Sequence, residues 1–381
     1  MNKQMKIAVF CPQLIPTHPA GSQMIRILRG LKNEFEFTIF SHNISQRMDL
    51  EGIKFYKIPI LIHRPLMLMY LMDYVKYLQI FKIIKNNFEI IHAIETCTPF
   101  ANLVTYHFCS AKFLDLIKND FVKYQGIQMP YRKLMYSFGK EMEHHLANNI
   151  YLKSIIAVSQ GLKKEINTYY NPLVSIEVIS NSVDIDRFVD AKKFRNKTRK
   201  NYNIKDKEIL GIICALGDWQ RKGLDILIES ISLIKNSNVK IIVIGKGPIE
   251  FYKNKCIEFG VIDQFIFVGF TSEVEKYYGA ADFFIFPSIY EALPLVVLEA
   301  AASGLPIIST PVNGVTEFLT DGKNGIFIER DPKSIADAIR LIIEDRKFLF
   351  KMGENSLKIS HKFNANKMID NYRAIYQKIA K

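Results

Sequence analysis

The chain alternates short apolar runs with stretches in which apolar residues recur at helical spacing. A short apolar run closed by a turn signal is typical of a buried parallel strand. In the first half, the runs predict strands at Ile7–Cys11, Phe37–Phe40, Lys54–Ile58, Glu89–His92, Leu103–His107, Ile155–Ser159 and Glu177–Ile179. In the second half, they predict strands at Ile209–Leu216, Lys240–Ile244, Phe265–Val268, Phe283–Phe286, Leu305–Ser309 and within 322–329.

Helices are predicted between these strands, at Ser22–Lys32, Gly161–Tyr169, Leu224–Lys235 and Leu295–Ala302, with a last one ending near Ile379. Strands that alternate with helices indicate an α/β protein with parallel sheets. The 381 residues are enough for two domains, each with its own core. The polar, basic segment 191–207 reads as a domain boundary followed by a solvated helix.

The most informative stretch spans residues 282–325. The strand Phe283–Phe286 is followed by a loop at 288–293. Pro294 stands where a first helical residue is expected, and the helix Leu295–Ala302 follows. The order strand, loop, helix, strand puts the loop at the carboxyl end of a parallel sheet, where such sheets bind ligands.

Two glutamates belong to this stretch, Glu291 in the loop and Glu299 on the second turn of the helix. Free amides at a helix start hold anions or sugar oxygens, so carboxylates beside them suit a polyhydroxylated ligand that carries phosphate. Alternatively, Glu291 complements the helix dipole and Glu299 is a solvated helix residue. The helix around Glu299 is apolar nearly all round, and a glutamate in such surroundings needs a partner.

The amino-acid composition indicates in which cellular compartment we expect the protein. Hydrophobic residues make up 49% and charged residues 23% of the chain, as in soluble globular proteins. The five cysteines follow no paired or metal-ligand spacing, so we expect reduced, mostly buried thiols and a cytoplasmic protein. We expect no signal peptide and no spanning segment, since Lys6 leads directly into the first strand and no apolar run approaches ~18 residues.

The net charge of +13 leaves three interpretations open: nucleic acid, an anionic membrane surface, or a preference for lysine in the proteome. No nucleic-acid motif is present, so a membrane surface is the better functional interpretation. The segment 62–85 is rich in Leu, Met and Tyr at helical spacing, with basic residues among them. It is either a surface helix that touches lipid, which would make the protein peripheral on the inner face of the cell membrane, or an amphipathic helix packed on the first sheet.

The stretch 282–325 carries the strings P-S-x-Y-E, L-E-A-x-A-x-G-x-P, N-G-V-x-E and D-G-x-N-G, and so resembles the family 4 glycosyltransferases of the GT-B fold. Glu291 and Glu299 match the two family glutamates that are separated by seven residues. The resemblance implies two Rossmann-like domains facing across a cleft: an acceptor-side domain over 1–185, completed by a helix over 364–381, and a nucleotide-sugar-binding domain over 186–363. It also implies sugar transfer from a nucleotide diphosphate to an acceptor hydroxyl with retention of configuration.

The resemblance assigns roles residue by residue. Glu291 contacts the donor sugar, Glu299 holds the ribose, and His107, which ends a predicted strand, approaches the donor sugar. The pair Arg221 and Lys222 lies in the loop after the first strand of the second domain, where two cations neutralise a diphosphate leaving group. The remaining residues assigned to donor binding are Ala292, Leu293, Pro294, Leu295, Gly217, Gly245, Gly269, Phe270 and Gly21.

Each assignment has an ordinary structural alternative. Gly21 is explained equally well by a turn, Arg221 and Lys222 by a basic surface loop, and His107 by a satisfied strand-end histidine. Asp184 and Asp186 form a D-x-D pattern, which we do not interpret as a metal site because the resemblance places it in the interdomain segment. We expect no metal and no cofactor besides the nucleotide-sugar substrate.

The expected partners are a nucleotide sugar and a glycan or lipid-linked acceptor from surface polysaccharide or glycolipid synthesis, and no nucleic acid. Two alternatives remain. A GT-B nucleotide-sugar epimerase shares the architecture but lacks this glutamate motif. A non-catalytic partner subunit would tolerate changes at Lys222 and Glu291.

Overall fold

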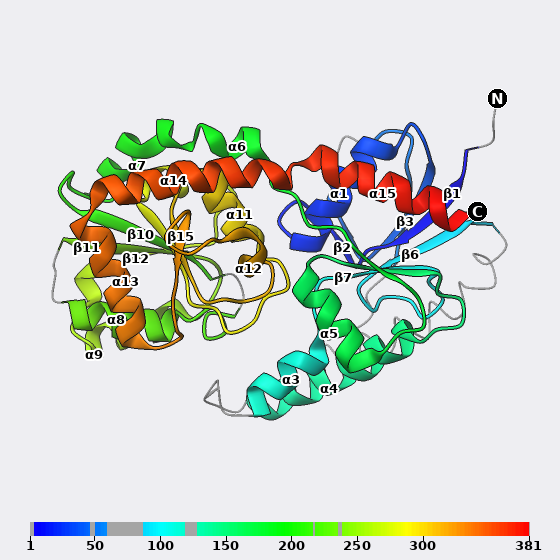
Figure 1. The fold of residues 1–381 in the computed structure, drawn as a ribbon, viewed down its shortest axis with the longest axis horizontal. Coiled ribbons are helices and arrows are strands. Elements are labelled where there is room, and N and C mark those ends of the chain that lie inside the picture. The colour runs from blue at the N-terminus through cyan, green and yellow to red at the C-terminus, as the bar shows by residue number, and fades with distance from the viewer. Residues whose placement is uncertain are drawn as a thin grey trace. The chain divides into compact units, whose positions relative to one another are not determined.

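The computed structural model describes residues 4–45, 50–58, 87–118, 128–215, 218–234 and 238–380 (Figure 1). The chain forms two compact units, one of residues 1–181 with 365–381 and the other of residues 182–364. The sequence placed these divisions at 185/186 and 363/364. The segment 62–85, in which a lipid-contacting helix is predicted, and Gly217 lie outside the described residues.

The first unit is built on a parallel sheet with the strand order β5-β3-β1-β6-β7-β8-β9 among the described residues. These strands are Lys54–Lys57, Glu36–Ser41, Lys6–Phe10, Ile90–Ile94, Leu103–Tyr106, Ser154–Ala157 and Ile176–Val178, and a small pair beside them comprises β2 (Gln13–Leu14) and β4 (Asn43–Ile44). The helices are α1 (Pro19–Leu31), α3 (Ser110–Lys118), α4 (Gln128–Ala147), α5 (Gln160–Tyr170) and α15 (Ala365–Ala380).

The last helix of the chain, α15, belongs to this first unit, where it packs beside α1 (Figure 1). Buried hydroxyls fix it to the sheet: the Tyr376 hydroxyl lies 2.9 Å from Nδ1 of His92, and the Tyr372 hydroxyl 3.2 Å from Oγ1 of Thr105. Nε2 of His92 lies 2.8 Å from the same Thr105 oxygen. His92 therefore joins the closing helix to two central strands.

The second unit is also built on a parallel sheet, with the order β12-β11-β10-β13-β14-β15. In that order the strands are Phe265–Gly269, Val239–Ile244, Ile209–Cys214, Phe283–Phe286, Ile307–Ser309 and Gly325–Phe327. The helices are α6 (Ile185–Val189), α7 (Arg195–Asn201), α8 (Leu224–Ile234), α9 (Ile249–Glu258), α10 (Glu275–Ala280), α11 (Leu295–Ala302), α12 (Val315–Phe318), α13 (Pro332–Glu344) and α14 (Arg346–Ser360). Short 3-10 turns occupy Ala191–Phe194, Ile262–Gln264 and His361–Phe363.

The central strands of both sheets are buried on their two faces, which is why they read as continuous apolar runs rather than alternating ones. The four residues of β13, for example, are fully buried. The edge strand β5 is exposed along its whole length. The predicted strands and the predicted helices that fall on described residues are present, most with ends shifted by one or two residues. All five cysteines are buried and free, as predicted. No helix among the described residues combines the length and the apolar composition needed to cross a membrane.

Three local predictions are wrong. The segment 191–207 lies inside the second unit, and Arg199 in it is only 4% exposed, because its guanidinium donates to Asp282 and to the carbonyls of Ala280, Lys205 and Glu208. Pro294 is the N-cap of α11 rather than its first residue. Helix α1 begins at Pro19 rather than at the predicted Ser22, so Gly21 is inside it.

Candidate functional site

Each sheet has one point at which the chain reverses the direction of strand addition. In the second unit the chain moves from β10 outward through β11 and β12, then returns to pair β13 with the other side of β10. Parallel sheets bind ligands outside the carboxyl ends of the strands at such a switch point. The loop after β10 carries Arg221 and Lys222, and the loop after β13 carries Glu291. The topology therefore brings these three predicted residues to the same crevice.

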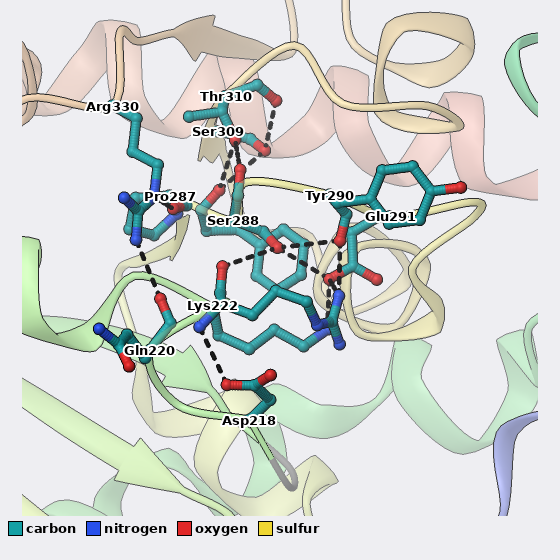
Figure 2. A network of polar contacts seen from close by, with 12 residues as sticks. Asp218, Gln220, Lys222, Pro287, Ser288, Tyr290, Glu291, Ser309, Thr310 and Arg330 are labelled. Carbon is teal, nitrogen blue, oxygen red and sulfur yellow. Dashed lines mark hydrogen bonds and ion pairs between the residues drawn. The ribbon is translucent and has the colours of Figure 1, made fainter. Parts of the chain in front are cut away.

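The three side chains form one buried ion cluster, and Figure 2 shows Lys222 and Glu291 of it beside Ser288. Oε1 of Glu291 accepts hydrogen bonds from Nζ of Lys222 at 2.5 Å and from Nη1 of Arg221 at 2.8 Å. The Ser288 hydroxyl also lies 2.9 Å from this oxygen. Glu291 is 9% and Lys222 8% exposed, so the cluster is largely shielded from water. The two cationic partners of Glu291 allow its carboxylate to be buried although it belongs to a loop.

The electrostatics of the cluster follow from burial and pairing. Burial alone would raise the pKa of Glu291, but the charges of Arg221 and Lys222 hold it below its ordinary value. Burial lowers the pKa of Lys222 to about 8, although Glu291 opposes this shift. The carboxylate is therefore ionised throughout the neutral range, and the lysine exchanges its proton within reach of physiological pH.

Close backbone approach sets the geometry of the two loops. Gly223 has a φ of +84°, and a Cβ there would lie 2.3 Å from the carbonyl oxygen of Pro287. Only glycine allows the β10–α8 loop to come this near to the end of β13. Asp218 closes the same loop, because its side chain accepts from the Arg221 amide at 3.1 Å.

Arg330 clamps the two loops together from the segment after β15 (Figure 2). Its Nη2 donates to the Gln220 carbonyl at 2.9 Å, and its Nε donates to the Pro287 carbonyl at 3.2 Å. Nη2 also lies 3.7 Å from Oδ1 of Asp225. One guanidinium thus joins the loop that carries the cations to the loop that carries Glu291. No sequence pattern pointed to this residue, since its contacts are made with backbone carbonyls.

The second motif glutamate has a different partner. Oε2 of Glu299 accepts from the Tyr278 hydroxyl at 3.2 Å, and Tyr278 itself is fully buried. Glu299 is half-buried, so one edge of α11 remains open to water. The predicted need for a partner is met by a tyrosine from α10 that no sequence pattern had singled out.

The other residues of the second unit that were assigned to donor binding fall into two groups. Ala292, Leu293 and Pro294 have buried side chains and Leu295 a half-buried one, so their backbone rather than their side chains is suited to contact a ligand. Phe270 is 44% exposed, and Nζ of Lys246 lies 4.9 Å from the centre of its ring. Gly245 and Gly269 join the loops after β11 and β12 through a 2.9 Å hydrogen bond between their backbones.

Two predicted residues belong to the first unit. His107 follows β7; burial lowers its pKa to about 4, and its Nδ1 has no hydrogen-bond partner among the described residues. Asn181 provides a side-chain hydrogen bond to the ring. The Gly21 amide donates to Nδ1 of His18 at 3.3 Å, so this amide is already capped within the first unit. Gly21 is needed for another reason, since a Cβ there would lie 2.1 Å from the Gln13 carbonyl oxygen.

No cluster of potential metal ligands occurs among the residues that the structure describes. Asp184 of the D-x-D pattern caps α6 instead, accepting from the Arg187 amide at 3.3 Å. The chemistry available in the second unit is that of two cations, a paired carboxylate and free backbone amides at one sheet edge.

Comparison with known proteins agrees with this site. Residues 194–359 match the family model described as glycosyl transferases group 1, and this range includes the two loops and both motif glutamates. An uncharacterized glycosyltransferase of Methanocaldococcus jannaschii is 26% identical over 283 residues, covering 72% of this chain and 70% of its own.

A second relative is the GDP-mannose-dependent alpha-(1-6)-phosphatidylinositol monomannoside mannosyltransferase of Mycobacterium tuberculosis, 28% identical over 209 residues. That match covers 51% of this chain and 54% of the relative, so the likeness to this relative spans about half of each protein.

Among solved structures, WaaG, a glycosyltransferase involved in lipopolysaccharide biosynthesis, superposes with a TM-score of 0.79 at 16% identity. The superposition covers 97% of this chain and 99% of that one. It shows that the chain has the GT-B fold, as the sequence predicted.

Proposed function

We propose that this protein is a retaining glycosyltransferase that moves a sugar from a nucleotide diphosphate to an acceptor hydroxyl, in surface polysaccharide or glycolipid synthesis. One observation carries the proposal: Arg221, Lys222 and Glu291 meet at the switch point of the second sheet. The names of the relatives, which describe glycosyltransferases and in one case a GDP-mannose donor and a glycolipid acceptor, support it.

Leaving-group stabilisation is the main chemical step that this site would assist. As the bond from the sugar to the diphosphate breaks, negative charge grows on the leaving phosphate oxygens. Fixed cations in a site shielded from water stabilise such charge far more than they would in bulk water. Arg221 and Lys222 are placed for this task because Arg330, Gly223 and Asp218 hold their loop.

In the free protein both cations are paired with Glu291, so the donor has to compete for them. The diphosphate carries more charge than one carboxylate and takes over Arg221 and Lys222. Glu291 keeps its contact with Ser288 and is then free to accept hydrogen bonds from the donor sugar. The same exchange raises the pKa of Lys222, because a second anion now faces the ammonium group.

The remaining contacts with the donor are inferred from which side chains and backbone groups are accessible. Glu299, oriented by Tyr278, holds the ribose hydroxyls, and the backbone at 292–295 contacts the sugar and phosphate. Phe270 offers an exposed ring on which the nucleobase stacks. We further propose that His107 of the first unit approaches the donor sugar during transfer. With two cations to meet the diphosphate charge, the reaction needs no divalent metal.

A thermal-shift screen tests the proposal first. A ligand that binds only the folded state raises the apparent melting temperature in proportion to the logarithm of its concentration. We expect UDP, GDP, ADP or dTDP to stabilise the protein, and Lys222→Ala to abolish that shift. Lys207→Ala is the matched control, because exposed Lys207 precedes β10 at the opposite end of the strand from the Lys222 loop. Equal shifts in both variants would contradict the assignment of Lys222.

The product distinguishes the alternatives. The stabilising nucleotide is supplied as its sugar derivatives, with and without hydroxyl acceptors, and the anomeric configuration of the product is read by proton NMR. Epimerised nucleotide sugar without acceptor would favour the epimerase, and a protein that binds but never turns over would favour the non-catalytic subunit. Loss of activity in chelator, restored by Mg²⁺, would contradict metal-independent transfer.

We also propose that the protein is cytoplasmic and binds peripherally to an anionic membrane, on the evidence of its net charge of +13. Each basic residue near such a surface contributes ~1 kcal/mol before salt screening. Flotation with anionic and with neutral liposomes measures the effect. Binding to anionic vesicles alone, lost at high salt, is expected, whereas equal absence from both at low salt would exclude charge-driven binding.

A further inference from the structure

The first sheet has a switch point of its own, and a glutamate stands at it. The chain leaves β1 toward β3 on one side and later returns to pair β6 with the other side of β1. Ligands of parallel sheets bind outside the carboxyl ends of two such strands. Glu95 is the first residue after β6, and its amide donates to the Thr105 carbonyl on β7 at 2.9 Å.

The backbone of Glu95 is strained. Its φ is +60°, in the left-handed region that L-residues other than glycine rarely adopt. Among the described residues, the others with this feature that are not glycine are Asn171 and Asn203, and asparagine tolerates it. Such strain in glutamate persists where the surrounding structure imposes it, and it is concentrated at functional sites.

The carboxylate of Glu95 lacks partners. It is half-buried, and it makes no hydrogen bond or ion pair with any residue that the structure describes. Burial accordingly raises its pKa. Glu143 in the same unit is the opposite case, since it accepts from the Ser110 amide at 2.8 Å, from the Ser110 hydroxyl and from the Tyr170 hydroxyl. A partly buried carboxylate without donors is costly, and it is suited to receive them from a ligand.

The strand order brings other polar groups of the first unit to the same edge of the sheet as Glu95, and their chemistry indicates what kind of ligand it takes. Cys97 fixes the turn at the end of β1, because its thiol lies 3.1 Å from the Phe10 carbonyl. His107 follows the neighbouring strand β7, and His18 caps the helix that follows β1. Burial lowers the pKa of both histidines, to about 4 for His107, so both rings are neutral at physiological pH. A carboxylate with neutral imidazoles suits uncharged hydroxyl groups rather than phosphate.

We propose that Glu95 binds the acceptor substrate, its carboxylate accepting hydrogen bonds from the hydroxyls of a sugar or polyol. The proposal rests on the glycosyl transfer proposed above and names the residue of the first unit that recognises the molecule being glycosylated. The cations of the second unit hold the phosphate of the donor, and Glu95 holds a neutral hydroxyl.

Steady-state kinetics with wild-type protein, Glu95→Ala and Glu95→Gln test this assignment. The donor is the nucleotide sugar that stabilises the protein, and the acceptor probes are p-nitrophenyl glycosides of glucose, galactose, mannose and N-acetylglucosamine. Loss of a hydrogen bond to a charged group predicts a rise of ~10- to 100-fold in acceptor KM for Glu95→Ala. Donor KM and the slow hydrolysis of donor by water are expected to stay within twofold of the wild type.

The control is Glu34→Gln, which removes a carboxylate of the same unit that pairs with Arg373 at the surface. It is expected to leave both KM values unchanged. An acceptor KM that is unaltered in Glu95→Ala, in a wild type that transfers sugar, would overturn the role of Glu95 while leaving glycosyl transfer intact. A wild type that binds no nucleotide sugar and modifies no hydroxyl compound would instead count against the proposed function.

Glu95→Gly adds a second measurement, the melting temperature, which would change in the opposite direction if Glu95 had only a structural role. Glycine adopts φ of +60° without strain, so this variant is expected to melt at the same or a higher temperature than the wild type while losing acceptor affinity. A melting temperature clearly below that of the wild type would mean that Glu95 holds the fold together, and would overturn the proposal without any acceptor being needed.

Discussion

The two switch points present the same topology with opposite electrostatics. Glu95 and Glu291 both stand in the loop after the strand that returns to the centre of its sheet. Glu291 is ion-paired with two cations and has a lowered pKa, whereas Glu95 has no partner among the described residues and a raised one. Strand order thus determines where the carboxylate lies in each sheet. The side chains of the facing loop determine whether it is ion-paired and in which direction its pKa is shifted.

The difference originates in the residues that follow the first strand of each unit. After β10 the chain supplies Arg221 and Lys222, which form an ion cluster with Glu291. After β1 it supplies His18, whose ring caps α1 and carries no charge at neutral pH. A crevice with cations is suited to the diphosphate, and a crevice without them is suited to a neutral acceptor.

The largest expected effect is that of Glu291→Ala. Removal of the carboxylate leaves two buried like charges, so we expect turnover to fall by ~10²- to 10³-fold, the range seen when one preorganised polar group of an active site is removed. We also expect a lower melting temperature, because breaking a buried ion pair costs ~3–5 kcal/mol. Transfer kinetics and thermal unfolding measure the two effects. Turnover at the wild-type rate would remove Glu291 from the site.

The pKa of Lys222 predicts that activity falls at alkaline pH. Its pKa of about 8 in the free protein means that the ammonium form needed for diphosphate binding declines above that pH. The kcat/KM for the donor should therefore fall ~10-fold per pH unit above pH 8. Because Glu291 raises the pKa of Lys222, Glu291→Gln should move this limb to lower pH. A profile that is flat from pH 7 to 10 would contradict the assignment.

Substitution of Arg330 tests whether donor binding depends on the link that this residue makes between the two loops. Arg330→Gln removes the link between the Gln220 and Pro287 carbonyls, so the cation loop and the Glu291 loop lose their fixed separation. Donor KM should rise ~10-fold, in keeping with one or two lost hydrogen bonds of a charged group, with acceptor KM unchanged. Arg340→Gln is the control, because it removes a half-exposed guanidinium on α13 that pairs with Asp337 and donates to the Leu233 carbonyl. A rise in acceptor KM alone would contradict the role given to Arg330.

The sequence predicted the second crevice better than the first for physical reasons. Pro287 and Gly304 mark element ends, so β13 and α11 were placed correctly, and the parallel topology alone brings the loops of Lys222 and Glu291 to one edge. The burial of Glu291 was missed because it depends on partners from another loop. Glu95 was missed because neither its backbone conformation nor its lack of partners leaves a trace in the sequence.

The smallest expected effect is also the most direct test of the comparison. It is the sign of the change in melting temperature when Glu291 and Glu95 are each replaced by glutamine. The pKa of Glu291 in the folded state lies below its unfolded value, so its ionisation stabilises the fold above about pH 4.5 and ceases to do so as the pH falls through the folded pKa. The pKa of Glu95 lies above its unfolded value, so ionisation at neutral pH costs stability.

Glu291→Gln should therefore lower the melting temperature at pH 7, and Glu95→Gln should raise it by a few degrees at most, since ~1 kcal/mol corresponds to ~2–4 °C in a domain of this size. Both differences should shrink as the pH is lowered toward full protonation of the wild-type carboxyls. Differential scanning calorimetry at pH 7 and under acid conditions measures all four values. Equal signs at pH 7 would show that the two carboxylates share one environment, and the division of charged donor and neutral acceptor between the two sheets would lose its basis.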